Sequence, residues 1–360
     1  MENKLSKIEN SILLQQRLSE ADAVTLFHAQ DLHWLGRLAN LACTRLNGNK
    51  ASYIINRSIN YTNYCILRCA MCAFSRSPGA NDGFDLEIDE IVKKASEALS
   101  FGITELHIVG GLHPTRSFSY YVEMIKALRQ ISKKLTLKCF TAIEILHFSK
   151  IAGLSVETVL ETLKQAGLDC LTGGGAEIFC PDIRSKIAEK KGSAIEYLKV
   201  HKTWHQMGGK STCTMLFGHI ESIKDRVNHL ALLRQLQDET NGFVGFVPLP
   251  WKPSNLRIKR YAPTGLDKLK TIAVSRLFLD NFKHITAYWP AFGRETAQVA
   301  LDYGADDLHG TLIEEKIFHM TNDQSPQQIS KTELISAIKE TGKIPIQRDS
   351  FYNPIEESTS

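Results

Sequence analysis

Short apolar runs alternate with longer amphipathic segments along the chain from about residue 50 onward. Eight of these runs are brief, rich in β-branched and other apolar residues, and show little alternation of polar and apolar positions. Runs of this kind are typical of strands that are buried on both faces of a parallel sheet. The predicted strands are residues 52–59, 105–111, 135–145, 169–179, 211–220, 242–250, 284–289 and 306–315.

The segments between the runs have polar start signals and glycine stop signals of helices. Asp89 is predicted to cap one helix at its N-terminus. Ser155 begins a second helix, which ends at Gly167. Ser222 and Asp225 form an S-x-x-D variant of the capping box at the start of a third. The chain therefore reads as a repeated alternation of strand and helix.

Sequential alternation of eight strands with helices predicts an α/β fold, and specifically a (β/α)₈ barrel. An open, doubly wound sheet is the alternative, because the sequence does not reveal the order of the strands. Residues 1–50 have apolar positions at helical intervals and are interpreted as an N-terminal helical cap. The barrel is assigned to residues 51–320. Residues 321–360 are assigned to a C-terminal helix and a polar tail that is expected to be disordered.

Composition narrows the classes of function. The chain has 360 residues, of which 43% are hydrophobic, so it can form a full core. Its net charge is +4 and its acidic and basic residues are interspersed, which does not favour nucleic-acid binding. No apolar run is long enough to span a membrane, and the start of the chain lacks the apolar core of a secretion signal. We therefore expect a cytoplasmic protein with no nucleic-acid or membrane partner.

Eight cysteines occur, and three of them lie close together in the stretch TNYCILRCAMCAFSR. Cys65, Cys69 and Cys72 have the spacing C-x₃-C-x₂-C and follow the first predicted strand. The other five, at positions 43, 139, 170, 180 and 213, are scattered through apolar segments and are interpreted as small buried residues. In a large cytoplasmic chain a framework of disulfides is not expected.

Three thiols match neither of the common closed metal sites. A structural zinc site takes four protein ligands, and a ferredoxin-type cluster takes four cysteines. Three thiolates instead fit a 4Fe–4S cluster with one iron left open, and catalytic metal centres keep such an open position for the substrate. Because the cysteine loop follows a barrel strand, it is predicted to lie at the C-terminal mouth, where barrel enzymes hold their catalytic groups.

The cysteine spacing, followed by an aromatic residue in the triplet CAF, resembles the signature of the radical S-adenosylmethionine (SAM) enzymes. The resemblance implies a TIM-like radical SAM barrel in which Cys65, Cys69 and Cys72 bind a 4Fe–4S cluster. It implies that SAM chelates the open iron and that Phe74 lies beside the adenine. It also implies that an electron from the cluster cleaves SAM to a 5′-deoxyadenosyl radical. Zinc binding or a chance grouping of cysteines is the alternative.

Two glycines and two carboxylates are expected to support SAM binding. Gly110 and Gly111 end a predicted strand, where bare backbone lets a ligand approach closely. They resemble the GGE element of the radical SAM family, although Leu112 stands in place of the acid. Glu144 and Glu177, in the predicted strands 135–145 and 169–179, could accept hydrogen bonds from ribose hydroxyls or act as acid–base groups. A tight turn at the glycines and local capping by either carboxylate are the alternatives.

A narrower resemblance covers residues from about 50 to 350. Stretches such as VGGLHPTRSFSYY, MLFGHIES and GADDLHGTLIEEKI are similar to the aminofutalosine synthases, the radical SAM step of the futalosine route to menaquinone. This resemblance implies a transferase that consumes SAM as a cosubstrate. In such an enzyme the adenosyl radical adds to the enol-ether double bond of 3-[(1-carboxyvinyl)oxy]benzoate and the aryl group migrates. Loss of carbon dioxide or bicarbonate then leaves 6-amino-6-deoxyfutalosine.

Two related groups of enzymes are the alternatives, namely the dehypoxanthine futalosine cyclases and the deazaflavin synthases, which share GGGAEI-like text. The implied substrate carries two carboxylates, so its pocket should offer cationic or polar donors. The candidate donors are Arg76, His113, His219 and Arg276, with Lys252 and Arg294 as further cations, and Tyr288 could stack on the aryl ring. Each of them could equally be an ordinary surface or packing residue. The resemblance implies an electron donor such as flavodoxin or ferredoxin. An iron–sulfur scaffold without catalysis is the non-enzyme alternative.

Overall fold

The computed structural model describes residues 2–253, 258, 261–321 and 326–355. The polar tail was predicted to be disordered, and residues 356–360 of that tail lie outside the described residues. The domain boundaries at residues 50 and 320 stay predictions.

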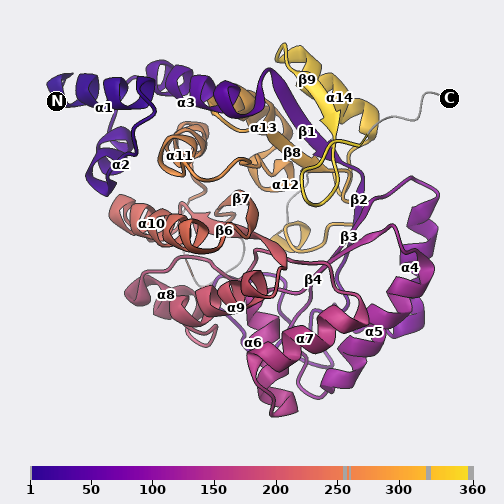
Figure 1. The fold of residues 1–360 in the computed structure, drawn as a ribbon. Coiled ribbons are helices and arrows are strands. Elements are labelled where there is room, and N and C mark those ends of the chain that lie inside the picture. The colour runs from indigo at the N-terminus through magenta and orange to yellow at the C-terminus, as the bar shows by residue number, and fades with distance from the viewer. Residues whose placement is uncertain (1, 254–257, 259–260, 322–325, 356–360) are drawn as a thin grey trace.

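Parallel strands form the centre of the molecule (Figure 1). The strands are β1 (Lys50–Ile54), β2 (Asn56–Ile59), β3 (Glu105–Ile108), β4 (Thr136–Cys139), β5 (Cys170–Leu171), β6 (Lys210–Phe217), β7 (Phe243–Pro250), β8 (Asp307–Gly310) and β9 (Ile344–Gln347). A six-stranded, curled sheet has the order β2-β3-β4-β5-β6-β7, and a three-stranded sheet has the order β8-β1-β9. All neighbouring strands within these two sheets are parallel.

Backbone pairings join the two sheets into one ring. β1 and β2 follow each other almost directly in the chain; β1 pairs with β8, while β2 pairs with β3. On the far side, the parallel bridges Phe246–Ile285 and Thr286–Asp307 connect β7 to β8. The predicted α/β barrel is therefore confirmed. The predicted strand 284–289 is reduced to these two bridges, because its chain turns into a helix at Trp289.

Helices cover the outer side of the curled sheet (Figure 1). The N-terminal helices are α1 (Glu2–Leu13), α2 (Glu20–Phe27) and α3 (Leu32–Asn47). The helices that follow are α4 (Ile88–Leu99), α5 (Phe118–Ile131), α6 (Ala142–Ala152), α7 (Val156–Ala166), α8 (Pro181–Ala188), α9 (Ala194–Gln206), α10 (Ile223–Thr240), α11 (Gly265–Phe278), α12 (Trp289–Phe292), α13 (Arg294–Ala300) and α14 (Lys331–Glu340). Two short 3₁₀ helices are η1 (Leu301–Tyr303) and η2 (His319–Thr321).

Side-chain caps decide where the helices start. α7 begins after the predicted cap Ser155, and α10 begins with the predicted capping box of Ser222 and Asp225. The prediction for α4 was wrong, because its cap is Glu87 and Asp89 lies in the first turn. The backbone N–H of Glu87 donates to the carboxylate three residues further on, so the helix begins earlier than the sequence pattern indicated.

Two predicted strands end early. Residues 135–145 form a strand only as far as Cys139, because Phe140 adopts a left-handed backbone (φ 63°) and Thr141 then caps α6. Of residues 169–179, only the two residues of β5 form a strand, and a glycine-rich loop follows. Both breaks occur at the C-terminal ends of barrel strands, where side chains and loops surround a cavity.

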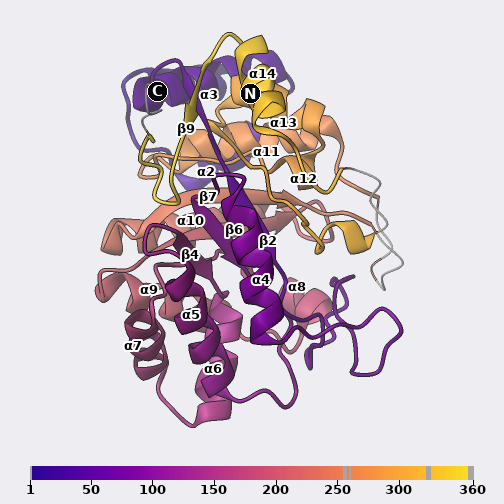
Figure 2. The same ribbon diagram turned by 90° about the vertical axis from the view of Figure 1, so that its right-hand side faces the viewer.

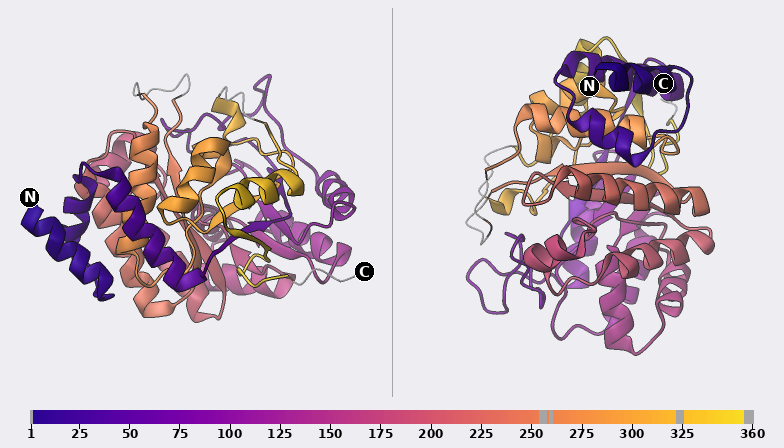
Figure 3. Two further views of the ribbon diagram at one scale, coloured as in Figure 1. Left: turned by 90° about the horizontal axis from the view of Figure 1, so that it is seen from above. Right: turned by 90° about the vertical axis from the view of Figure 1, so that its left-hand side faces the viewer.

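The two ends of the chain pack on the same side of the barrel. Helices α2 and α3 lie against α10 and α11 (Figure 3). β9 pairs with β1, and α14 packs beside both of these strands (Figure 2). The apolar faces of the N-terminal helices are thereby buried; Leu35, Leu38 and Ala39 of α3 are almost inaccessible to solvent.

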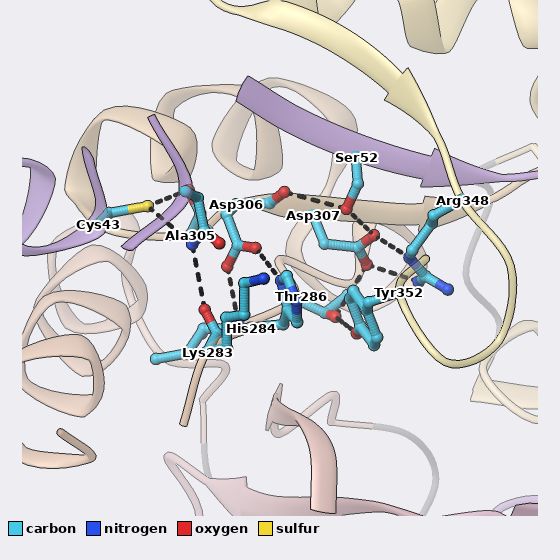
Figure 4. A network of polar contacts seen from close by, with 12 residues as sticks. Cys43, Ser52, Lys283, His284, Thr286, Ala305, Asp306, Asp307, Arg348 and Tyr352 are labelled. Carbon is cyan, nitrogen blue, oxygen red and sulfur yellow. Dashed lines mark hydrogen bonds and ion pairs between the residues drawn. The ribbon is translucent and has the colours of Figure 1, made fainter. Parts of the chain in front are cut away.

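The C-terminal segment closes the N-terminal end of the barrel (Figure 4). Arg348 donates to both carboxylate oxygens of Asp307, at 2.6 and 2.9 Å. The hydroxyl of Tyr352 lies 2.8 Å from that of Thr286, and its ring stacks on His284. This end of the barrel is therefore filled by paired side chains. The opposite end contains the cavity.

Candidate active site

A cavity of about 300 Å³ lies at the C-terminal ends of the barrel strands. Its wall contains the three clustered cysteines, the glycines after β3 and β5, and side chains of β3, β4, β6 and β8. The cavity thus connects the loop that was predicted to bind a cluster with the interior of the barrel.

The cysteine loop runs from the end of β2 to the start of α4. Cys65 donates its backbone N–H to Arg76 O at 3.0 Å, and Cys72 donates to Cys69 O at 3.1 Å. The N–H of Ile66 donates to the carbonyl that follows the two glycines after β3, at 3.0 Å. These bonds hold the loop across the mouth, so that all three thiols line the same cavity.

The surroundings of the thiols fit an iron–sulfur cluster. Burial raises the pKa of Cys69 to about 11 and also raises the pKa of Cys72, while the Lys191 ammonium opposes both shifts. Binding to iron requires thiolates, so the metal must displace these protons. Among the residues that the structure describes, no three His, Cys, Asp or Glu side chains could hold a single metal ion. A 4Fe–4S cluster does not need such a group, because each thiolate binds a different iron.

A buried ion pair lies next to the cysteines. The Lys191 ammonium donates to a carboxylate oxygen of Glu177, and both residues line the cavity. Burial alone would raise the pKa of Glu177, but Lys191 outweighs this effect and lowers it. Glu177 was predicted to face the mouth, and it does line the cavity. Lys191 was not predicted; it follows α8 in a polar loop, and no periodic signal in the sequence singles it out.

Glu144 also lines the cavity, but from a different element than predicted. It lies in the first turn of α6 rather than in a strand, and it forms a T-x-x-E capping box with Thr141, so the alternative of local capping holds for this carboxylate. One carboxylate oxygen accepts hydrogen bonds from Tyr61 Oη at 2.5 Å and Gly110 N at 3.1 Å. The other accepts from Thr141 N at 2.7 Å. Burial raises the pKa of Glu144. Glu144 therefore braces the backbone of the glycine stretch.

Gly110 and Gly111 line the cavity, and the structure shows a second reason for their small size. A Cβ atom on Gly111 would lie 2.2 Å from Tyr64 O and 3.1 Å from Cys65 Cβ. A Cβ atom on Gly110 would lie 2.6 Å from the Tyr61 ring. The expectation from sequence was that these glycines leave room for a ligand. The structure adds that they let the cysteine loop pack directly against the end of β3.

Phe74 and Tyr288 also line the cavity, as does Lys252. Phe74 is buried and packs edge-on against Phe84. Tyr288 packs edge-on against His309, with ring centroids 4.9 Å apart. The expected aromatic residue next to the cluster loop and one of the expected substrate-binding residues therefore have surfaces in the same cavity.

Two of the predicted substrate-binding residues are tied to other partners in the mouth loops. Neither Arg76 nor His113 is part of the described cavity wall. Arg76 is paired with Asp82, at 2.6 Å from Nε, and also donates to a backbone carbonyl of the cysteine loop. His113 lies 3.3 Å from Asp85. Both side chains therefore order the loops around the cavity.

His219 and Arg276 are likewise outside the cavity wall as described. His219 Nδ1 is 2.9 Å from Glu221, and Nε2 is 3.1 Å from Leu216 O. Arg276 is buried on α11, where it donates to Asp306 at 2.5 Å and to three backbone carbonyls. The positions of these two residues do not support the predicted role in substrate binding, because their donors are already used inside the protein.

The floor of the cavity is polar, which the sequence analysis did not predict. His107 of β3 stands beside Lys138 of β4 in the parallel register, and His309 of β8 lies across from His107, with ring centroids 6.2 Å apart. All three side chains line the cavity. The description of these runs as poor in alternation overlooked that polar residues recur at every second position of β3 and β8, and in any case the pattern does not show which strands become neighbours.

Burial and charge determine the protonation of this floor. Burial would raise the pKa of Glu105, but Lys138 outweighs it and lowers that pKa far below its usual range. Burial lowers the pKa of His107 to about 4 and that of His309 to about 3. Both imidazoles are therefore neutral near pH 7. His309 also has a left-handed backbone (φ 67°), which costs a non-glycine residue about 1–2 kcal/mol.

Several polar atoms of the cavity wall have no hydrogen-bond partner within the part of the chain that is described. These atoms are buried, and they are Asn60 Oδ1, Ser75 Oγ, His107 Nδ1, Trp251 Nε1 and His309 Nδ1. Buried polar atoms normally find partners, because leaving one unpaired costs about 1–3 kcal/mol. The group of unpaired atoms around one cavity indicates a site built for a polar ligand.

Residues 59–233 match the model of the radical SAM superfamily, and residues 240–360 match that of the CofH/MqnC C-terminal region. The aminodeoxyfutalosine synthase of Thermus thermophilus is 43% identical, over 98% of this chain and 96% of its own length. The chain belongs to the radical SAM superfamily. It is an enzyme of that superfamily, for which a 4Fe–4S cluster and SAM are implied, and the thiol loop, glycines and cavity described above fit both groups.

Enzymes that catalyse other reactions are also similar to this chain. A 5-amino-6-(D-ribitylamino)uracil–L-tyrosine 4-hydroxyphenyl transferase of Archaeoglobus fulgidus is 38% identical over 88% of this chain and 92% of its own. A cyclic dehypoxanthine futalosine synthase of Streptomyces coelicolor is 34% identical over 93% of this chain and 85% of its own. The superfamily is thus shown, and the particular reaction has to be argued separately.

Solved structures of radical SAM proteins share the fold. The hydrogenase maturase HydG of Carboxydothermus hydrogenoformans matches with a TM-score of 0.77 at 16% identity, covering 98% of this chain and 81% of its own. Methylornithine synthase (PylB) matches with a TM-score of 0.74 at 17% identity, covering 94% and 97%. At these identities the likeness concerns the fold alone. None of the helices in the described ranges is long and apolar enough to cross a membrane.

Proposed function

We propose that the protein is an aminodeoxyfutalosine synthase, which joins the 5′-deoxyadenosyl group of SAM to 3-[(1-carboxyvinyl)oxy]benzoate. The bond between sulfur and C5′ of SAM breaks and methionine leaves, the aryl group migrates, and the vinyl carboxylate leaves as carbon dioxide or bicarbonate. The product is 6-amino-6-deoxyfutalosine. The observation that carries this proposal is the 43% identity to the Thermus thermophilus synthase along 98% of the chain. The relatives with other names reported above are less similar, at 38% and 34%.

In this proposal the mouth of the cavity holds the cofactors. Cys65, Cys69 and Cys72 bind the 4Fe–4S cluster, and the methionine part of SAM lies against Gly110 and Gly111. When bound, the reduced cluster and SAM together supply a 5′-deoxyadenosyl radical. Phe74 lies beside the adenine. Glu177 accepts hydrogen bonds from SAM. Glu144 accepts a hydrogen bond from Gly110 N–H and so holds the glycine backbone in position for SAM.

The deeper part of the cavity holds the enol ether. Tyr288 offers a flat aromatic surface at the wall, and the polar floor offers donors for an anionic substrate. The vinyl carbon has to lie within about 3–3.5 Å of the adenosyl 5′ carbon for the two to combine before the radical is quenched. A cavity that reaches from the thiol loop into the barrel supports such an approach. A flavodoxin or ferredoxin is the proposed electron donor.

A labelling experiment tests the proposed function. The anaerobically reconstituted protein is incubated with dithionite, the enol ether and SAM that carries ¹³C at the ribose 5′ position, and the products are weighed by mass spectrometry. We expect labelled 6-amino-6-deoxyfutalosine, with free 5′-deoxyadenosine as a minor by-product. Label found only in 5′-deoxyadenosine would contradict the proposal.

Parallel incubations separate the alternatives. Consumption of dehypoxanthine futalosine, with 5′-deoxyadenosine formed in step, would identify a cyclase. Consumption of tyrosine and 5-amino-6-(ribitylamino)uracil would identify a deazaflavin-type synthase. A protein that binds iron but never cleaves SAM would be a scaffold.

A further inference from the structure

The floor of the cavity contains a cation without a hydrogen-bond acceptor among the described residues. Lys138 is only 4% exposed, and its ammonium lies 3.7 Å from Glu105 Oε2, which is too far for a good hydrogen bond. Within the described ranges, no hydrogen bond of this ammonium to another residue is present. Burying an ammonium group without acceptors is costly, so proteins supply them from their own groups or from a ligand. Lys138 lines the cavity, where a ligand or water can supply them.

Two further donors lie at the same place. His107 stands next to Lys138 across β3 and β4, and His309 faces His107 from β8. A neutral imidazole carries one N–H donor, and Nδ1 of each ring is buried without a hydrogen-bond partner in the described part of the chain. Neither nearby carboxylate accepts a hydrogen bond from these three side chains. Asp307 is bound by Arg348, and Glu105 is not part of the cavity wall.

We propose that Lys138, His107 and His309 form an anion site that binds the aryl carboxylate of the substrate. This inference rests on the proposed function, because the enol ether named there has one carboxylate on its ring and one on its vinyl group. The depth of the site in the barrel shows which of the two carboxylates it would bind. His107 precedes Gly111 by four residues, and Gly111 lies beyond the C-terminal end of β3, so the two positions are at most about 13 Å apart along the chain. The vinyl group reacts at the mouth, so the ring carboxylate points to the floor.

The aromatic wall is consistent with this orientation. Tyr288 packs edge-on against His309, so a ring whose carboxylate reaches His309 lies along the face or edge of Tyr288. The site therefore takes an aryl carboxylate, and the three donors set the distance between the reacting vinyl group and that carboxylate. A substrate without a carboxylate at this end lacks the contact that places its vinyl group at the mouth of the cavity.

The test uses reconstituted holoenzyme with SAM and two simple probes. Binding of 3-methoxybenzoate, which carries the ring carboxylate, is compared by equilibrium dialysis with binding of methoxybenzene, which lacks it. Lys138→Met is expected to weaken 3-methoxybenzoate binding roughly 10- to 100-fold, as the loss of charge-assisted hydrogen bonds does elsewhere. Binding of methoxybenzene should not change. Dithionite-driven cleavage of SAM without substrate reports that the cluster is intact.

Two further variants keep the test decisive. Lys343→Met is the matched control, because Lys343 is similarly buried but is bound to Asn40 outside the cavity wall. The double variant Glu105→Gln/Lys138→Met removes Lys138 together with the carboxylate behind it, and so avoids an unpaired buried carboxylate if the single variant does not fold. The double variant is expected to lose the preference for 3-methoxybenzoate as well. Binding of that probe as tight as in the unaltered protein would overturn the proposal.

Turnover of the enol ether separates this inference from the proposed function. If the enol ether is not converted but 3-methoxybenzoate binding depends on Lys138, the anion site stands and the assigned reaction is wrong. If the enol ether is converted and its KM is unchanged in the double variant, the reaction stands and the anion site is wrong. If the proposed reaction and the anion site are both correct, the KM for the enol ether rises roughly 10- to 100-fold in the double variant. The analogue 2-phenoxyacrylate, which has no ring carboxylate, then shows no such rise.

Discussion

The two ends of the barrel interior contain similar buried charges but treat them differently. At the N-terminal end, Asp307 and Arg348 share two hydrogen bonds, and Ser52 and Thr286 complete the Asp307 carboxylate (Figure 4). At the cavity end, Lys138 has only a distant carboxylate at 3.7 Å among the described residues. The first set is closed by the protein itself, and the second leaves donors facing a cavity.

The two ends thereby separate polar groups that the protein satisfies by itself from polar groups that face a ligand site. Removing one partner of a buried, hydrogen-bonded ion pair leaves an uncompensated charge, whereas a buried ammonium without a hydrogen-bond acceptor already reduces stability until a ligand or water supplies one. Neither Asp307 nor Arg348 has an unpaired side-chain atom within the part of the chain described, while His107 and His309 each have one. Four experiments test whether the two ends differ in this way.

Replacing Cys65, Cys69 or Cys72 by Ala should abolish product formation and lower the iron content, because each thiolate binds a separate iron. Iron per chain and product are measured after anaerobic reconstitution. Cys139→Ala and Cys213→Ala are the controls, since both residues are buried in the core. Loss of the cluster in either control would mean that the cluster ligands have been assigned to the wrong cysteines.

Gly111→Ala should strongly reduce iron occupancy and activity, because the new Cβ atom would lie 2.2 Å from Tyr64 O and push the cysteine loop away from β3. The matched control is Gly265→Ala, where no atom lies within 4 Å of the new Cβ position. Normal iron content in Gly111→Ala, combined with weaker SAM binding, would show that this glycine serves only to admit the ligand.

Arg348→Met should destabilise the protein by about 3–5 kcal/mol, because it leaves the buried Asp307 carboxylate without its partner. Chemical denaturation followed by far-UV circular dichroism measures the change in the free energy of unfolding. Adding Asp307→Asn should recover part of the loss. The comparison between the ends predicts a smaller loss for Glu105→Gln/Lys138→Met than for Asp307→Asn/Arg348→Met, because the Lys138 ammonium forms no hydrogen bond among the described residues. Equal losses would remove the distinction.

Acid should weaken the closed end through Asp307. Burial would raise the pKa of this carboxyl group, but Arg348 outweighs it and lowers the pKa from 3.8 to about 2. A lowered folded-state pKa contributes stability that is present above the unfolded pKa and is lost as the pH falls through the folded pKa. The free energy of unfolding should therefore fall by about 2 kcal/mol more in the unaltered protein than in Asp307→Asn between pH 4 and pH 2. Parallel curves for the two proteins would contradict this account.

Much of the fold could be predicted because its signals are local. The caps Ser155 and Ser222 start helices as the sequence indicated, since a cap depends on the next few residues only. The predicted strand 135–145 was too long for local reasons that the pattern of apolar residues does not show. Phe140 breaks a strand by its left-handed backbone, and Glu144 belongs to a capping box although it follows an apolar run.

In the candidate site, too, the residues that lie close together in sequence were predicted better than those with distant partners. The spacing of Cys65, Cys69 and Cys72 by itself indicated an open cluster site, because one short loop carries all the ligands. Arg276 was expected near the substrate because of its charge, and only its tertiary partner Asp306 shows that its donors are used elsewhere.

The alternation of strands and helices and the loop with three cysteines could be read from the sequence, because both follow from local patterns and spacing. The closure of the barrel and the composition of the cavity floor became visible only in the folded chain. His107, Lys138 and His309 come from three strands far apart in the chain, and the ring closure between β1 and β8 together with the register of β3 and β4 brings them together. Register and closure depend on the packing of the whole barrel, and no single segment encodes them.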